Sequence, residues 1–537
     1  MKKQYLLFLG IFIVLLPILI YRDYTPDNEL KYLSIAEESI RDGNIFAFYN
    51  HGEPYADKPP LYLWIVTLGK LIFGKHVMFF LSLFSLIPAF ITIGIMNKWV
   101  RQERQFDEKL NTMMLGSSAF FLACSVVLRM DMLMTMFITL AVYTFYRMYR
   151  FNNRGIGAKS LYKKWSILLP VYTFLAIFSK GAVGIMVPLM SIIVFLGINR
   201  KLKTVGKYIG WKFWGILAAL CGVWFTGVFL DGGTEYLNNL LFNQTINRAV
   251  NSFHHKEPFY WYFITYWYAI APWSIVAVVA IVIGFKRRLI RGDLLTMFAT
   301  VSLGTIVMMS CISSKIVIYL LPAFPCLIYL GAILIGEIGH SKWLNVAVGI
   351  PAAIFVLLQG VAIYAAKKEL VPIELPAPVY YYTVILCAGG VAALYQIWNR
   401  NLPKAITSIA TSMFVLIFAA GLSIEKLNDM IGLENASLYA KDEMKNLQKS
   451  SGREAEVVYY DFRSGDNLDV YFGHPVKELK KEELQSASNM VMVVKERRFK
   501  RDSALNAALG NRPRKLYGEF AIAVPYTHLT LPTKSLV

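Results

Sequence analysis

Apolar runs of about 20 residues recur along most of this chain, and no other feature constrains its fold as strongly. A helix of that length crosses a hydrocarbon layer ~30 Å thick. The 537 residues are 56% hydrophobic and only 17% charged, which excludes an ordinary soluble protein. Membrane β-barrels are also excluded, because their strands alternate apolar and polar residues over about ten positions. The sequence therefore predicts an all-α polytopic membrane protein.

Thirteen of these runs are long enough to be predicted as transmembrane helices, and together they make a transmembrane domain over residues 1–424. They cover residues 5–21, 78–97, 111–128, 132–149, 166–179, 182–198, 211–230, 260–284, 294–312, 317–336, 343–366, 380–398 and 405–424. The first run is longer than the core of a secretion signal, and no small-residue cleavage site follows it. We interpret it as a signal anchor whose N-terminus is cytoplasmic.

Residues 59–74 form a further apolar stretch, and the placement of basic loops decides whether it crosses. If it does not cross, four basic loops are cytoplasmic, as the positive-inside rule requires. These loops are residues 98–110, 147–164, 199–212 and 285–293. If it crosses, all four move outside, and its sixteen residues would reach only ~24 Å. We therefore predict that 59–74 is an interfacial helix on the outer face.

This topology predicts a multi-pass protein of the cell's inner (plasma) membrane. Residues 22–77 form an outer juxtamembrane loop, residues 231–259 a long outer loop, and everything after residue 424 is extracytoplasmic. Membrane lipids are then obligatory partners. Lysines and arginines in the cytoplasmic loops account for the net charge of +20, so we predict no nucleic-acid partner.

The tail after the last span has a different composition and predicts a second, small α/β domain over residues 425–523. It loses the apolar runs and gains charge. Residues 436–449 and a stretch near 477–487 favour helices, and Glu456–Tyr460 and Met490–Val494 favour buried strands. Residues 524–537 show neither the alternation of a strand nor the period of a helix. They resemble translated sequencing-adapter read-through, and we predict that they are an artefact.

Charged residues at the membrane edge are costly and are therefore candidates for function. Asp27 and Glu29 open an amphipathic helix in the first outer loop, where a helix cap is the alternative explanation for Asp27. Asp131 lies in a predicted outer turn, where an ion pair within the turn is the alternative. Carboxylates in such places suit a general base that takes a proton from an attacking hydroxyl.

Basic residues at the predicted outer turns could converge on one anion. A phosphate at the membrane surface fits them, because lysine and arginine both bind phosphate well. Snorkelling lysines and helix turns are the alternatives. The candidates for this substrate-binding role, with the acid next to the first of them, are Asp57, Lys58, Arg129, Lys180, Arg248 and Lys315.

Cysteine and histidine usage predicts no metal centre. The five cysteines all fall inside apolar runs, and no CxxC or Cys/His cluster exists. We interpret His254 and His255 as an exposed loop pair.

Several of these segments, in this order, resemble the GT-C glycosyltransferases that use polyprenyl-phosphate sugars. The relatives are the lipid A aminoarabinose transferases and the protein O-mannosyltransferases. The similar segments are TPDNELKYLSIAEE (25–38), GEPYADKPPLYLW (52–64), LRMDMLMTMF (128–137), FSKGAVGIMVP (178–188), NRAVNSFHHKEPFYWYF (247–263) with APWS (271–274), and SSKIVIYLLPAFP (313–325). The (E/D)KPP segment around Lys58 is the most specific of them.

The resemblance implies sugar transfer from a polyprenyl-phosphate donor to an envelope glycolipid such as lipid A, a glycan or a protein. It also implies that the first acidic loop supplies the catalytic carboxylate, although Asn28 stands where the family has aspartate. Asp131 matches without a shift. Thr245 stands where the aminoarabinose enzymes have a metal-contacting histidine, so no metal or other cofactor is predicted, although a divalent ion stays open.

Two other functions remain open at this point. A transporter or flippase of lipid-linked sugars would show inverted repeats and charges at mid-membrane. We find no clear repeat between the halves, and the charges lie at span ends. A non-enzymatic assembly protein acting through its tail would leave the outer lysines unexplained.

Overall fold

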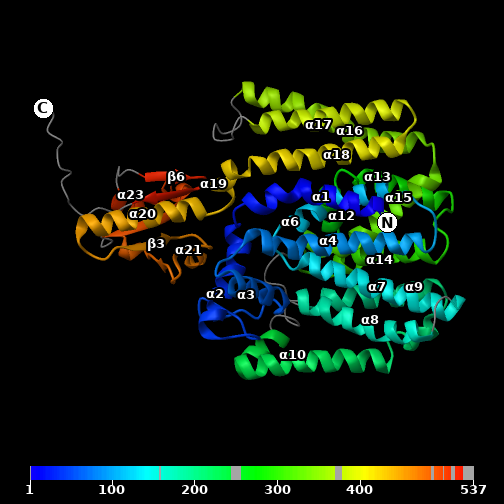
Figure 1. Cartoon of the computed structure of the whole chain (residues 1–537), viewed down its shortest axis with the longest axis horizontal. Helices are drawn as coiled ribbons and strands as arrows, with labels where there is room; N and C mark the ends of the chain where they lie inside the picture. Colours follow the sequence, from blue (N-terminus) through cyan, green and yellow to red (C-terminus); the bar gives the residue numbers. More distant parts are fainter. Residues whose placement is uncertain are drawn as a thin grey trace.

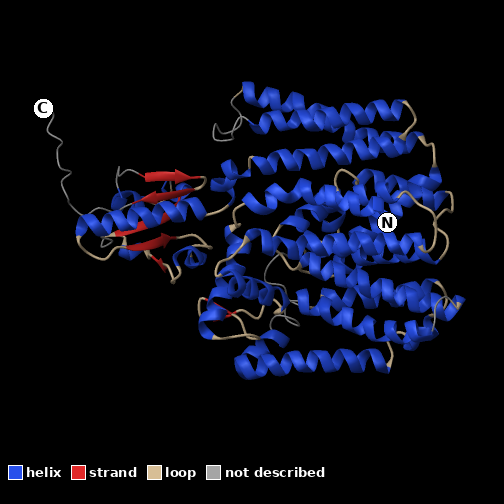
Figure 2. Cartoon of the chain, in the orientation of Figure 1, coloured by secondary structure: helices blue, strands red, loops and turns tan. Residues whose placement is uncertain are grey.

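A bundle of helices makes up most of the molecule, and a small sheet lies beyond one end of it (Figure 1, Figure 2). The computed structural model describes residues 2–155, 159–242, 256–368, 378–484, 489–499, 501–509 and 514–523. The predicted artefact at 524–537 and the candidate Arg248 lie outside the described residues. The helices of the bundle are α1 (Lys2–Tyr21), α4 (Met78–Arg101), α5 (Glu108–Gly116), α6 (Ala119–Val126), α7 (Asp131–Arg154), α8 (Lys159–Lys180), α9 (Val183–Ile198), η2 (Leu202–Lys207), α10 (Trp211–Asn238), α12 (Trp261–Ala269), α13 (Ser274–Lys286), α14 (Asp293–Ser310), η4 (Val317–Ala323), α15 (Phe324–Ile338), α16 (Lys342–Lys367), α17 (Pro378–Trp398) and α18 (Leu402–Leu422).

Within the described residues, seven helices are long and apolar enough to cross a membrane, or nine if two bent pairs each count as one span. The chain is thus an integral membrane protein by length and composition, and the number of thirteen spans stays a prediction. The helix made by η4 and α15 is the central one, because 94% of its most apolar 18-residue stretch is buried inside the protein.

Two predicted spans are not continuous helices. The stretch 111–128 is interrupted at Ser117–Ser118 between α5 and α6, and α6 then meets α7 at 115°. The stretch 260–284 bends by 113° between α12 and α13. Pro272 stands in that break and has no N–H for the helical hydrogen bond. Each break leaves a short helix, α6 or α12, at a steep angle to the longer helix that follows it.

The predicted interfacial helix is α3 (Leu61–Phe73), a short helix of 13 residues at the end of the bundle nearest the sheet (Figure 1). It begins after Pro60, which occupies the N-cap, and ends at Gly74 in the left-handed region. The same end carries η1 (Pro26–Leu30), α2 (Lys31–Asp42) and the two-residue strands β1 (Tyr49–Asn50) and β2 (Glu53–Pro54). We call it the site end of the bundle.

The chain after α18 passes through η5 (Ile424–Leu427) and α19 (Asn428–Ile431) into a region that we call the sheet region, residues 434–523. It holds five strands in the order β4-β3-β5-β7-β6, with β3 parallel to β4 and β5 and the other two pairs antiparallel. Its elements are α20 (Glu434–Ser451), β3 (Glu456–Tyr460), η6 (Asp466–Leu468), α21 (Asp469–Phe472), β4 (Lys477–Glu478), η7 (Lys481–Glu483), β5 (Met490–Lys495), α22 (Glu496–Phe499), α23 (Ser503–Leu509), β6 (Arg514–Tyr517) and β7 (Phe520–Ala523).

The strands predicted from the apolar runs EVVYY and MVMVV are β3 and β5, which pair directly in the middle of the sheet. The predicted helix near 477–487 is wrong over its described part. Lys477 and Glu478 are an edge strand beside β3, and only a 3-10 turn follows. The division into domains at residue 424 stays a prediction.

Candidate active site

The first acidic segment is tied to the turn before α7 through Glu29. Arg22 donates two hydrogen bonds to the Glu29 carboxylate, at 2.6 and 2.7 Å. The amide and hydroxyl of Thr25 donate to it at 2.8 and 3.0 Å, and the amide of Leu128 donates at 2.7 Å. Glu29 is completely buried, so these five bonds occupy its oxygens. The structure therefore gives Glu29, a predicted catalytic acid, the contacts of a residue that holds two segments together.

Asp27 is different, because its side chain is exposed on the π-helix η1. The amides of Glu29 and Leu30 both bond to the carbonyl of Thr25, which makes the wide turn. Short π-helical turns are rare and often occur at functional sites. No ion pair joins Asp27 to another residue of the described part of the chain. Its carboxylate is thus open to an incoming molecule.

Asp131 is the centre of a buried charge cluster at the start of α7. Its side chain is 0% exposed, and the Arg129 guanidinium donates to it at 3.0 Å. The ammonium of Lys180, at the end of α8, also bonds to Asp131 and lies 5.0 Å from the centre of the Tyr319 ring. The cluster therefore joins α7, α8 and η4. Its residues Asp131, Lys180 and Tyr319 are far apart in the sequence.

The tight turn after Lys180 fixes the end of α8 and therefore limits where the Lys180 side chain can reach. Gly181 has a φ of +84°, a conformation that favours glycine, and it ends α8. Gly184 packs so closely on α8 that a Cβ there would lie 2.3 Å from the backbone of Ala176. The KG turn predicted from the sequence is therefore a tight reversal between two packed helices.

Lys58 bonds to Asp57 at 2.8 Å, just before Pro59 and Pro60, which precede α3. Trp64 of α3 packs on Phe178, with ring centres 5.1 Å apart, and Phe178 lies two residues before Lys180. Two of the predicted phosphate ligands thus lie on neighbouring elements of the site end, and Lys180 shares the Asp131 carboxylate with Arg129.

Lys315 is a buried cation that bonds to main-chain oxygens. Its ammonium donates to the carbonyls of Glu257 and Ile312, at 2.9 and 2.6 Å, and its side chain is almost completely buried. No carboxylate of the described residues pairs with it within 4.0 Å. One donor and the positive charge remain for an anion, since an ammonium group has three N–H bonds.

The sheet region reaches the acidic segment directly. Asn467 donates to the carbonyl of Pro26 at 3.2 Å, one residue before Asp27. Asp23 accepts from the amide of Glu434 at 2.9 Å and from the hydroxyl of Tyr471 at 3.2 Å. Burial, with the Glu434 charge adding to it, raises the pKa of Asp23 to about 6. The acidic segment is therefore held between the bundle and the sheet region.

The described residues offer no metal centre, because no three His, Cys, Asp or Glu side chains among them are grouped to hold an ion. Thr245, Arg248, His254 and His255 lie outside these residues.

Sequence reasoning missed the residues that hold the site in place. Arg22 and Asp23 follow the first apolar run and resemble ordinary flanking charges. Tyr319 lies within an apolar run, and Asp231 lies just after one. Their partners are distant in sequence, so the only signal available was a charge directly next to a predicted span.

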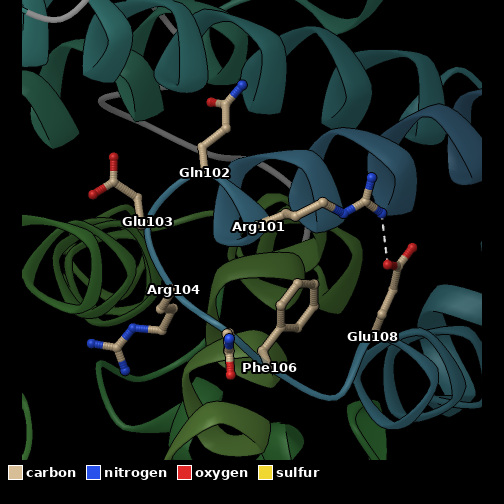
Figure 3. A pocket seen from close by; sticks show the side chains of 7 residues that line it. Arg101, Gln102, Glu103, Arg104, Phe106 and Glu108 are labelled. Atoms are coloured by element: carbon tan, nitrogen blue, oxygen red, sulfur yellow. Dashed lines mark hydrogen bonds and ion pairs between the residues drawn. The ribbon is translucent and has the colours of Figure 1, made fainter.

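The opposite end of the bundle carries a second group of charges around an open cleft (Figure 3). Arg101 pairs there with Glu108 at 2.6 Å, across the loop that joins α4 and α5. Arg150 pairs with Glu103 at 3.1 Å. We call it the far end, and none of the predicted site residues that the structure describes lies there.

Comparisons with known proteins agree with this architecture. A family model described as dolichyl-phosphate-mannose-protein mannosyltransferase matches residues 57–224, which include Lys58, Asp131 and Lys180. The crystal structure of ArnT from Cupriavidus metallidurans bound to undecaprenyl phosphate superposes with a TM-score of 0.74 at 15% identity, over 99% of this chain and 100% of that one. The protein therefore has a GT-C glycosyltransferase fold, and the resemblance predicted from its sequence is confirmed.

Two curated relatives bring the similarity closer to particular proteins. An uncharacterized protein of Aquifex aeolicus (strain VF5) is 24% identical over 424 residues, which is 75% of this chain and 79% of the relative. An undecaprenyl phosphate-alpha-4-amino-4-deoxy-L-arabinose arabinosyl transferase of Pseudomonas savastanoi pv. phaseolicola (strain 1448A / Race 6) is 35% identical over 63 residues, 12% of each chain. The chain thus resembles the ArnT and O-mannosyltransferase group.

Proposed function

We propose that this protein is a membrane glycosyltransferase that moves a sugar from a polyprenyl-phosphate carrier to a hydroxyl or phosphate of an envelope acceptor. The acceptor is a lipid A-like glycolipid, a glycan or a protein, on the extracytoplasmic face of the inner membrane. The observation that carries the proposal is the cluster at Asp131. Arg129 and Lys180 share this one carboxylate, so the cluster has one cation more than it has acids. Lys58, which pairs with Asp57, and the buried Lys315, which bonds to main-chain oxygens, are the other basic candidates.

A lipid phosphate would complete this cluster. Its negative charge matches the surplus, and it would bring to Arg129 and Lys180 the compensation that their one shared carboxylate, Asp131, cannot. The charge on the leaving phosphate grows as the bond to the sugar breaks, and cations already in place stabilise it. Undecaprenyl phosphate in the similar ArnT structure supports a lipid of this class as the donor's carrier.

Asp27 is the proposed general base. The acceptor oxygen attacks the anomeric carbon, the bond from that carbon to the phosphate oxygen breaks, and the acceptor's proton passes to the Asp27 carboxylate. Attack opposite to the leaving phosphate inverts the anomeric carbon. Asp27 suits this step because it is exposed, whereas Asp131 is enclosed by Arg129 and Lys180. Asp131 instead orders the two cations, and Glu29 holds η1 against α7.

The test is sugar transfer from a polyprenyl-phosphate donor by the purified full chain, with the variants Lys58→Met and Asp27→Asn. Losing one charged hydrogen bond in Lys58→Met raises the donor KM about 10- to 100-fold. Asp27→Asn lowers kcat about 100-fold or more while the donor KM stays near that of the wild type. The matched control is Arg101→Met at the far end, which keeps both constants. Wild-type kinetics in both site variants would refute the proposed site.

A further inference from the structure

A hairpin in the first outer loop lies against the end of α10, and one carboxylate holds its first leg. The Oδ2 atom of Asp231 accepts hydrogen bonds from three consecutive backbone amides, those of residues 45, 46 and 47, at 2.8, 2.6 and 2.8 Å. Three amides that converge in this way make an anion-binding concavity. The Asp231 carboxylate fills this concavity and thereby anchors the loop. The concavity is therefore not a second phosphate site.

Tyr236, one turn further along α10, holds both legs of the same hairpin. Its hydroxyl accepts from the amide of Phe48 at 3.1 Å and donates to the carbonyl of Tyr55 at 2.9 Å. The side chain is 4% exposed, so water does not compete for these bonds. Tyr55 lies three residues before Lys58. The path from α10 to the candidate phosphate ligand is therefore short.

The backbone of α10 is adapted to this contact. Gly232 lies against Ala47, and a Cβ at Gly232 would come within 2.5 Å of the Ala47 side chain. Gly233 interrupts the helix with a φ of +71°. The interruption separates Asp231 from Tyr236, so that each meets its own part of the hairpin.

An aromatic cluster joins this contact to the other candidate ligand. Trp64 of α3 and Trp224 of α10 each pack on Phe178, and their ring centres lie 5.1 and 5.3 Å from that of Phe178. Phe46, inside the amide group held by Asp231, packs on Trp64 at 5.3 Å. Phe178 lies two residues before Lys180. The hairpin, α3, α8 and α10 thus form one packed unit that carries Lys58 and Lys180.

We propose that Asp231 and Tyr236 are positioning residues for the donor phosphate, which set the distance between Lys58 and Lys180 by clamping residues 45–56 onto α10. We call this contact the α10 clamp. The proposal rests on the proposed function, because the ligand is the phosphate of a polyprenyl-phosphate sugar. It deepens that function by adding two residues that do not touch the donor. Asp231 and Tyr236 lie at the start of the predicted outer loop 231–259, so the clamp also fixes where that loop begins.

The experiment compares Asp231→Ala, Asp231→Asn and Tyr236→Phe with two matched controls in the full chain. Asp107→Ala removes a carboxylate that also bonds to a backbone amide, at the start of α5. Tyr329→Phe removes a buried hydroxyl that donates to Asn97 at 2.6 Å in the middle of the bundle. The readouts are donor KM, kcat, and hydrogen–deuterium exchange of the peptide that covers residues 45–58.

We expect Asp231→Ala and Tyr236→Phe to raise the donor KM about tenfold, with kcat within about threefold of the wild type. Asp231→Asn, which keeps an acceptor oxygen, has a smaller effect. Exchange in the 45–58 peptide becomes faster in Asp231→Ala and stays unchanged in both controls. Undecaprenyl phosphate binding to the purified variants weakens by the same factor as the KM rises.

Two outcomes overturn the inference. Faster exchange with an unchanged donor KM would leave the clamp a purely structural contact. Unchanged exchange in Asp231→Ala would show that the carboxylate does not hold the loop. Failure of the proposed function looks different, because Lys58→Met would then keep the wild-type donor KM whatever the clamp variants do.

Discussion

The two ends of the bundle both carry clusters of charge, and they differ in the balance of charge. At the site end, the side chains of Asp131 and Lys180 are 0% and 4% exposed, and Arg129 shares the same carboxylate. At the far end, each arginine described above has its own acid. Arg101, 42% exposed, pairs with Glu108 (Figure 3), and the buried Arg150 pairs with Glu103.

The difference separates two uses of charge. Exposed pairs contribute little to stability, because water solvates each partner almost as well as the other partner does. Buried charges lose that water, and an unequal number of them is costly unless a ligand restores the balance. The Arg101–Glu108 pair thus resembles an ordinary surface ion pair, and the Asp131 cluster has the charge that suits the binding of an anion.

The largest effect is expected from breaking the Asp131 cluster. Asp131→Asn leaves the buried Lys180 ammonium without a carboxylate, which should lower the free energy of unfolding by about 3–5 kcal/mol and abolish transfer. In Asp131→Asn with Lys180→Met the buried ammonium is removed as well, and only Arg129, 24% exposed, is left without its carboxylate, so most of the stability recovers while transfer does not. Thermal unfolding in lipid nanodiscs and the transfer assay measure the two effects. Recovery of transfer in the double variant would show that the pair serves only the fold.

A smaller effect is expected from the pH dependence of Asp23. The pKa of its carboxyl is about 6, above the ordinary 3.8, so the folded state binds more protons between these values. The closed state, in which Asp23 is buried, therefore gains stability as the pH falls through 6 and loses it as the pH rises. The gain is at most about 3 kcal/mol. Opening free energies for residues 425–434, from native-state hydrogen exchange at pH 5 and 7.5, measure it.

Asp23→Asn is the matched variant for this test, since it keeps an acceptor but does not titrate. Arg22, Tyr24, Glu434 and Tyr471 also face this carboxylate, and they remain in the variant. We expect its opening free energy to be nearly independent of pH over this range. The same pH dependence in variant and wild type would assign the effect to another group.

The smallest effect is expected at the far end. Glu108→Gln breaks the exposed pair with Arg101 and should change the free energy of unfolding by less than about 1 kcal/mol. Transfer should be unaffected. A loss comparable to that of Asp131→Asn would remove the distinction between the two ends.

Sequence alone could predict the parts of the fold that depend on composition. The reversal at Lys180–Gly181 was predictable because a lysine and a glycine interrupt one apolar run, and α8 and α9 end and begin there. The break at Ser117–Ser118 was not, because two serines hardly change the hydropathy of the span. Bends of this kind depend on which neighbouring helices can satisfy the freed backbone groups.

The candidate site was predictable only as a set of charges at span ends. Lys58, Arg129, Asp131 and Lys180 were named from their positions, and the structure brings the last three into one cluster. What each acid binds could not be predicted, since Glu29 meets the Leu128 amide 99 residues away. Asp231 and its three amides are nearly 190 residues apart, and nothing near it in sequence marks it as a loop anchor.

The hydrogen bond between the amide of Asp23 and the side chain of Asn428, 3.0 Å long, also sets the parity of the chain's membrane crossings. Two residues in contact at the bundle end must lie on the same side of the bilayer. The number of crossings between them is therefore even. The twelve predicted spans after the first satisfy this condition, and a crossing by residues 59–74 would make thirteen. One bond across 405 residues thus excludes every topology in which the acidic loop and the sheet region face different compartments.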